Sequence, residues 1–336
     1  GYPGRRPGWA GTRAEGVGGP PPSVMIELFK SPNFDFIGKR RWAYLVSVVF
    51  IAVGLVSMWV QGGLRYGIDF SGGTLIQARF EQPVPVDRIR GALDQIKLGE
   101  SVIQEFGDPR EFIFRLPLAL VPAEEMTRRV REALAKEPAL GRVEIRRVEF
   151  VGPQVGRDLQ LQALWAVLYG MVGILIYVAI RFDLKGGVAS IAAIVHDVLV
   201  CLGAMSVTGR EMSLPVLAAL LTIIGYSVND TIVAYDRIRE NRGKGFKKGL
   251  SFAEQINIAI NQTLSRTVLT ALTVFFSTIV LFLFGGKVLE DLAFVLTVGV
   301  ITGTYSTIYI AGALIVDWTA WAEARAQRAR KVVAKA

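Results

Sequence analysis

Long apolar stretches alternate with polar segments along most of the chain. Six of these stretches have about the length needed to cross the hydrocarbon core of a bilayer. The core is about 30 Å thick, which requires roughly 20 helical residues. We therefore predict a polytopic α-helical membrane protein with six spans. The third and fourth spans contain ionisable side chains but are apolar elsewhere. The approximate ranges are 42–61, 161–180, 187–208, 214–234, 267–284 and 292–316.

The segment between the first two spans, residues 62–155, has the pattern of a soluble α+β domain. Residues 74–80 alternate between apolar and polar positions, which predicts a strand. Helical spacing follows at 86–96 and 122–136, and further strands are predicted at 101–106, 111–116 and 142–150. The order β-α-β-β-α-β is typical of a small ferredoxin-like sandwich.

The remaining polar segments divide the rest of the chain. Residues 1–33 are rich in Gly and Pro, which favours a disordered tail or linker, and residues 34–61 hold the start of the bundle and the first span. Residues 156–316 hold the other five spans, and residues 317–336 form a basic tail. A capping-box pattern at Ser251 and Glu254 opens an amphipathic helix over 251–264. This helix is expected either at the membrane surface or packed on the end of the bundle.

The charge distribution predicts the orientation of the chain in the membrane. The chain has 38 Lys and Arg residues against 29 Asp and Glu residues, a formal charge of +9. Sixteen of the basic residues flank the spans on one side, whereas the short loops opposite hold only Arg210 and Lys287. Because basic loops stay in the cytoplasm, both termini are expected there and residues 62–155 outside. This asymmetry explains much of the basic excess, so it removes the main support for nucleic-acid binding.

The chain offers few residues for catalysis or metal binding. It contains one Cys and one His, which excludes an internal disulfide and a His-rich metal site. No phosphate-binding Gly-Lys-Ser/Thr loop and no nucleophile–base set occurs outside the spans. We therefore expect no metal, no cofactor and no enzymatic activity.

Four ionisable residues lie at membrane depth and are the candidate functional residues. A charge in hydrocarbon costs about 2.5–3.5 kcal/mol on insertion scales, so such groups are functional candidates by default. Asp230 lies well inside the fourth span, and Arg266 at the start of the fifth lies at similar depth and is a candidate partner for it. His196 and Asp197 lie near the middle of the third span. For each acid, a purely structural role in helix pairing remains the alternative.

Four motifs in this order resemble the SecD/SecF family of bacterial protein-export membrane proteins, in particular its SecF members. The first span is followed by Gly-Ile-Asp-Phe-Ser-Gly-Gly at 67–73, which contains Asp69, Gly72 and Gly73. The second span is preceded by Val-Gly-Pro-Gln-Val-Gly at 151–156, which contains Gly152 and Pro153. The fourth span carries the run 224–233, which contains Asn229-Asp230-Thr231 and continues into 236–241. The fifth opens with Asn-Gln-Thr-Leu-Ser-Arg-Thr at 261–267, which contains Arg266.

The resemblance implies a fold and a function. It implies a half bundle of the resistance-nodulation-division (RND) type that pairs with SecD, as a separate or fused chain, in the bacterial cytoplasmic membrane. Such a pair uses the proton motive force to promote export of preproteins after SecA and the SecYEG translocon have started it. The resemblance assigns Asp230 and Arg266 to the proton-conducting region and leaves His196 and Asp197 as secondary candidates. The alternatives are a scaffold that only stabilises SecD or the translocon, and an RND-type exporter of small molecules or lipids.

Overall fold

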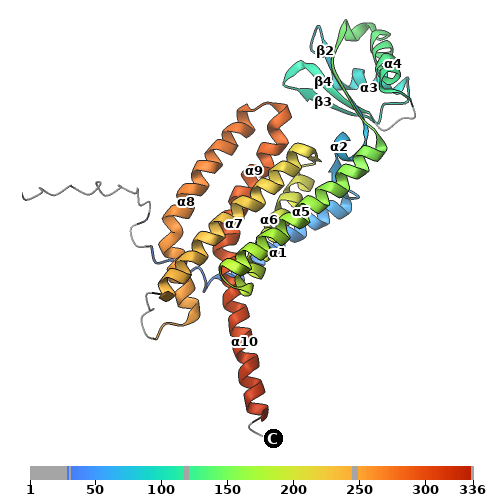
Figure 1. Cartoon of the computed structure of the whole chain (residues 1–336). Coiled ribbons are helices and arrows are strands. Elements are labelled where there is room, and N and C mark those ends of the chain that lie inside the picture. The colour runs from blue at the N-terminus through green and yellow to red at the C-terminus, as the bar shows by residue number, and fades with distance from the viewer. Residues whose placement is uncertain (1–28, 30–31, 117–120, 244–248, 334–336) are drawn as a thin grey trace, which may run out of the picture.

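Six long apolar helices form one bundle in the computed structural model, which describes residue 29 and residues 32–116, 121–243 and 249–333 (Figure 1). The six predicted spans are confirmed. The helices are α1 Arg40–Val60, α5 Pro153–Arg181, α6 Leu184–Val207, α7 Leu214–Gly243, α8 Phe252–Phe284, and a sixth that runs through α9 Lys287–Ser306, a π-turn η2 Thr307–Ala311 and α10 Gly312–Val333.

Helix α6 is central to the bundle and packs against α1, α5, α7 and α9. Small residues allow the closest approach. Gly54 of α1 faces Gly203 of α6, and a methyl group at position 54 would lie 2.5 Å from the Gly203 Cα atom. The outward faces of α1, α5 and α8 carry exposed Leu, Val, Ile and aromatic side chains. This is the surface expected of helices that face lipid, because apolar side chains there meet an apolar solvent.

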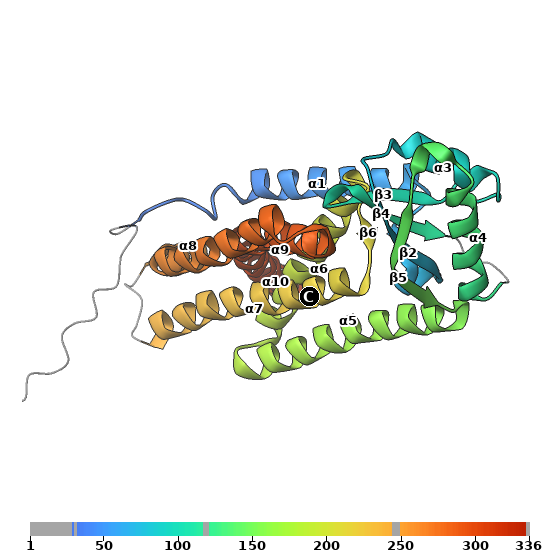
Figure 2. The same cartoon turned by 90° about the horizontal axis from the view of Figure 1, so that it is seen from above.

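A separate α+β domain lies at one end of the bundle (Figures 1 and 2), and α10 projects from the other end (Figure 1). The domain contains β2 Gly73–Phe80, α3 Val86–Asp94, β3 Val102–Phe106, β4 Asp108–Leu116, α4 Ala123–Ala135, the 3-10 turn η1 Pro138–Leu140 and β5 Val143–Val151. The sheet is antiparallel with the order β3-β4-β2-β5. The predicted ferredoxin-like domain is confirmed.

Strand alternation explains why one face of this sheet is covered. Ile76, Ala78 and Phe80 of β2 are buried together with Phe112 and Phe114 of β4. Successive side chains of a strand point to opposite faces, so these residues share the face that packs on α3 and α4. The opposite face of the sheet is directed toward the adjacent end of the bundle, where two short segments meet in parallel. These segments are β1 Arg65–Tyr66 and β6 Glu211–Met212.

The amphipathic stretch at 251–264 is not a separate surface helix, which corrects one of the two expectations for it. The capping box at Ser251 and Glu254 is present, but the helix that it opens continues unbroken to Phe284 because neither Gly nor Pro interrupts it. Ile256, Ala259 and Ile260 are buried in the bundle core. The stretch therefore packs on the end of the bundle. The expectation for residues 1–33 falls mostly outside the described residues.

Candidate functional site

Asp230 lies on the buried face of α7, and its side chain is only partly satisfied. One carboxylate oxygen, Oδ1, accepts a hydrogen bond from Thr267 Oγ1 of α8 at 2.8 Å. The other oxygen, Oδ2, is buried without a hydrogen-bond partner among the described residues. An unpaired carboxylate oxygen away from water is costly, so the structure keeps this acid in place at a cost in stability.

Arg266 does not pair with Asp230 in this structure, contrary to the suggested ion pair. Its side chain is exposed, and it makes no salt bridge with a described carboxylate, although it lies near enough to act on Asp230 through space. The geometry of α8 gives the reason. Consecutive helical residues point about 100° apart, so the turn that directs Thr267 at Asp230 directs the neighbouring Arg266 away from it.

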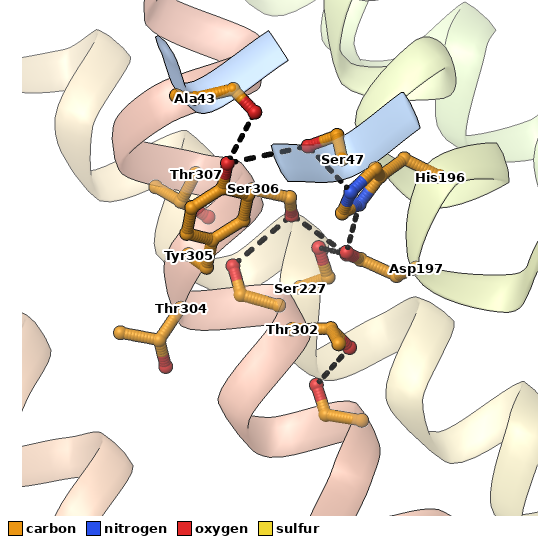
Figure 3. Close-up of polar contacts among 12 residues, drawn as sticks. Ala43, Ser47, His196, Asp197, Ser227, Thr302, Thr304, Tyr305, Ser306 and Thr307 are labelled. Carbon is orange, nitrogen blue, oxygen red and sulfur yellow. Dashed lines mark hydrogen bonds and ion pairs between the residues drawn. The ribbon is translucent and has the colours of Figure 1, made fainter. Parts of the chain in front are cut away.

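Asp197 forms the centre of a second buried site, which joins three helices (Figure 3). Its Oδ2 atom accepts hydrogen bonds from Ser227 of α7 and Ser306 of α9, each at 2.7 Å. Its Oδ1 atom lies 3.0 Å from Nδ1 of His196. Asp197 is 1% exposed. This carboxylate therefore has three polar partners, whereas Asp230 has one.

His196 extends this site toward α1. Its Nε2 atom lies 3.0 Å from Ser47 Oγ, and Tyr305 stacks against the imidazole ring (Figure 3). Two hydrogen-bond arrangements fit these contacts. A neutral imidazole with its proton on Nδ1 accepts from Ser47. A protonated imidazole donates to Ser47, which then donates to the Tyr305 hydroxyl at 3.3 Å. The two arrangements differ in the orientation of the Ser47 hydroxyl group.

A short polar contact brings the two sites close together. Thr231, next to Asp230 in sequence, bonds Thr307 at 3.1 Å, and Thr307 follows Ser306, which bonds Asp197. Thr307 also opens the π-turn η2, a wide helical turn that is frequent at functional sites. Sequence reasoning named Thr267 only as part of the motif that opens the fifth span and did not identify Ser47 or Ser306, because Ser and Thr are common in membrane helices and carry no distinctive signal.

The motif at 67–73 connects the α+β domain, which we call the outer domain after the side of the membrane expected for it, to the start of α7. Asp69 Oδ2 accepts a hydrogen bond from the Leu214 backbone N–H, the first residue of α7, at 2.8 Å. The Gly67 N–H donates to the Met212 carbonyl at 2.8 Å. Beside these contacts, Arg115 of β4 pairs with Glu211 of β6 at 3.0 Å. The helix that carries Asp230 therefore begins where the outer domain is attached.

The glycines of this motif are required for close backbone packing. Gly72 has a φ of 71° and Gly73 a φ of 137°, values that favour glycine because it has no Cβ atom. A methyl group at Gly73 would also lie 2.6 Å from the Leu116 carbonyl oxygen. The second motif meets the same turn, because Gly152 and Pro153 begin α5, whose Gln160 donates to the Phe70 carbonyl at 2.8 Å.

Asn229, the last of the motif residues, is exposed on α7. Gly225 and Thr222 lie on the same exposed side of the helix. These three residues form a strip of small and polar side chains on an otherwise apolar surface.

Two family models match the chain. The model described as protein export membrane protein SecD/SecF, C-terminal, matches residues 130–321, and the SecD/SecF GG motif model matches residues 56–84. Among curated proteins, the protein translocase subunit SecF of Calditerrivibrio nitroreducens is 44% identical over 87% of this chain and 96% of its own length. The SecF subunit of Magnetococcus marinus is 46% identical over 87% and 94%.

Solved structures show the same likeness. The crystal structure of SecDF from Thermus thermophilus, a translocon-associated membrane protein, matches with a TM-score of 0.76 and 42% identity. This match covers 86% of the present chain but only 39% of the SecDF chain. A SecDF structure in a super-membrane-facing form matches with a TM-score of 0.66 and 40% identity. The chain therefore belongs to the SecD/SecF family of protein export membrane proteins.

Proposed function

We propose that the chain is the SecF-type half of a SecD–SecF pair, an accessory part of the Sec translocase that uses the proton motive force to promote preprotein export. Asp230 is the proton-carrying group, and Arg266 acts with it. The SecYEG translocon, SecA and the exported chain are the further partners of this assembly. The proposal rests on the family of the chain and on one observation, the buried and half-satisfied carboxylate of Asp230.

The surroundings of Asp230 support a proton role over a purely structural one. A carboxylate that serves only to pair helices is expected to have both oxygens bonded, as Asp197 does. Asp230 instead has one oxygen that accepts from Thr267 and one that is free to bind a proton. Arg266 lies one residue from Thr267, so a movement of α8 changes the charge that Asp230 experiences.

The attachment of α7 supplies a route from the proton site to the outer domain. Asp230 lies on α7, and Asp69 binds the first N–H group of the same helix. A shift of α7 along its axis is therefore transmitted to the motif at 67–73, which leads directly into β2. In this proposal the outer domain moves when Asp230 gains or loses its proton.

The exposed strip on α7 supports a partner half in the membrane. Thr222, Gly225 and Asn229 share one side of this helix, and small and polar residues are enriched where membrane helices pack together. Arg266 is exposed on the neighbouring helix α8. A second, SecD-type bundle that covers this surface shields the polar groups from lipid and brings the proton site to the interface between the halves.

Replacement of Asp230 by Asn tests the proposal. Asn keeps the size and the acceptor for Thr267 but cannot bind a proton. We expect the variant to assemble with its SecD partner at the normal level and to lose the part of export that depends on the proton gradient. Export into inverted vesicles, measured with and without the gradient at matched levels of complex, gives the result. Full gradient-dependent stimulation in the variant would show that Asp230 does not carry the proton.

A further inference from the structure

The segment before α1 is fixed to the side of α8 by asparagine side chains. We call residues 32–39 the strap. Asn261 Oδ1 accepts from the Phe34 N–H at 2.8 Å, and its Nδ2 atom donates to the Phe34 carbonyl at 2.9 Å. Asn257 Oδ1 accepts from the Phe36 N–H at 2.9 Å, and its Nδ2 atom also donates to the Phe34 carbonyl. These bonds hold the backbone of the strap at two points, one helical turn apart on α8.

Apolar contacts anchor the strap on its other side. Phe36 and Ile37 are 8% and 3% exposed and belong to the core of the bundle. The ring of Phe36 packs against Tyr309 of the π-turn η2, with 5.6 Å between ring centroids. The strap therefore lies between α8 and the π-turn and is attached to both.

The strap and the proton site contact different faces of α8. Taking Thr267, which bonds Asp230, as the reference direction, Arg266 points about 100° to one side. Asn261 precedes Thr267 by six residues, so it points about 120° to the opposite side. A rotation of α8 that turns Arg266 toward Asp230 therefore carries Asn257 and Asn261 away from the strap and breaks their hydrogen bonds.

We propose that Asn257 and Asn261, through the strap, hold α8 in the rotational setting in which Thr267, and not Arg266, faces Asp230. They are positioning residues, because they touch neither Asp230 nor its proton. The significance of this setting for coupling rests on the proposed proton role of Asp230. The setting itself is a property of the fold and is testable without any export assay.

The test measures the accessibility of position 267 in the membrane-embedded chain with its SecD-type partner. Thr267→Cys is introduced together with Cys201→Ser, and labelling by N-ethylmaleimide is followed over time. Thr267 is 4% exposed, so slow labelling is expected. The double change Asn257→Leu and Asn261→Leu should raise the labelling rate roughly 25-fold, since one net hydrogen bond corresponds to about a fivefold change in an equilibrium constant and each asparagine contributes at least one.

Two controls separate rotation of α8 from general loosening of the bundle. Gln255→Leu removes a polar side chain of the same helix that bonds, among the described residues, only to the nearby Leu250 carbonyl, and it should leave labelling at position 267 unchanged. Thr297→Cys on α9 is a buried reporter outside α8, and its labelling should not respond to the asparagine changes. If the double variant does not accumulate, the single change Asn261→Ala serves in the same comparison.

Two results would overturn the inference. Labelling at position 267 that is no faster in the asparagine variants would show that the strap does not set the rotation of α8. An equal rise at positions 267 and 297 would show that the asparagines only stabilise the bundle. Asp230→Asn is measured in parallel for gradient-dependent export. If that variant alone gives a result against the proton role, the proposed function fails while the rotational setting stands.

Discussion

At the scale of single residues, Asp197 and Asp230 differ in how completely their oxygens are bonded. Asp197 binds His196, Ser227 and Ser306, so it connects α6 with α7 and α9. Among the described residues, the Asp230 side chain accepts a hydrogen bond only from Thr267. A buried polar group with all its partners stabilises a packed core, whereas a partly satisfied one costs stability. We therefore assign Asp197 mainly to holding the bundle and Asp230 to exchanging a proton.

This contrast predicts different effects of the same substitution at the two positions. Asp197→Asn places an amide N–H group or an uncharged oxygen where His196 and two hydroxyl groups require a carboxylate. We expect the free energy of unfolding to fall by about 1.5–3 kcal/mol, the range for a hydrogen bond to a charged group. Asp230→Asn keeps its one hydrogen bond and should change stability little. Thermal unfolding of the two purified variants in the same detergent checks this, and equal losses would contradict the assignment.

The hydrogen-bond partners of both acids could not be predicted from the sequence, although the depth of the acids could. The depth of Asp230 and of Asp197 followed from the length of the apolar stretches, because a helix places each residue at a fixed height. Their bonds to Thr267, Ser227 and Ser306 depend on how neighbouring helices are rotated, and hydropathy does not contain that information. The suggested pair of Asp230 and Arg266 was wrong for this structure for the same reason, since similar depth does not imply the same face.

At the scale of elements, periodic patterns in the sequence were sufficient to predict strands and helices. They did not predict where backbones contact one another. The strands and helices of the outer domain followed from alternation and from helical spacing. The attachment of the strap to α8 could not be predicted from such patterns. Asn257 and Asn261 bind the backbone of the strap, and no apolar pattern marks such a contact. The close approach of α7 and α9 is a further example, because a methyl group at Gly299 of α9 would lie 2.4 Å from the Ile223 side chain of α7.

The crossing of α1 and α6 supplies a test of backbone packing. A methyl group at Gly203 would lie 2.9 Å from the Gly54 Cα atom, whereas one at Gly173 of α5 would meet no atom within 4 Å. Gly203→Ala should therefore force the two helices apart and lower stability by about 1–3 kcal/mol, as overpacking does. Gly173→Ala should be neutral. The thermal unfolding temperatures of the two variants, compared at equal expression, show whether close packing at this crossing is needed for the stability of the bundle.

At the scale of the whole molecule, the ion pair of Arg115 and Glu211 joins the outer domain to the bundle and predicts a response to pH. Burial raises the pKa of Glu211 above its usual value, and Arg115 only partly opposes this. Glu211 therefore takes up a proton earlier than an ordinary Glu as the pH falls, and the ion pair is lost. Because the pKa is raised in the folded state, this proton uptake favours the native chain, so acid should loosen the joint without unfolding the domain.

Fluorescence energy transfer between dyes at Arg131 of the outer domain and Val288 of the bundle measures this loosening. We expect the transfer to change as the pH is lowered toward the ordinary range for Glu, and Glu211→Gln should remove the pH dependence. The pair of Asp108 and Arg110 offers a contrast within the same domain. Hydrogen bonds from Arg110 lower the pKa of Asp108 to about 2, so that pair should persist. A transition that is unchanged in Glu211→Gln would assign the response to another group.

The orientation of the chain is the last prediction, and the structure sharpens its electrostatic basis. The two basic residues in the outer loops are neutralised by acids, because Arg210 pairs with Glu290 and Asp291 while Lys287 pairs with Glu290. At the other end, the exposed basic residues of α10 extend away from the bundle (Figure 1). The positive charge that determines topology is therefore concentrated at one end, and we expect that end to lie in the cytoplasm.

Labelling of single cysteines in a Cys201→Ser chain measures the orientation directly. Arg131→Cys on α4 and Arg328→Cys on α10 are both exposed, so differences in burial do not affect the comparison. In vesicles with the native outside facing out, a membrane-impermeant maleimide should label position 131 and leave position 328 unmodified until detergent is added. Inverted vesicles should give the opposite pattern. If position 328 were labelled first in the native orientation, the outer domain would face the cytoplasm and could not act on chains that have already crossed the membrane.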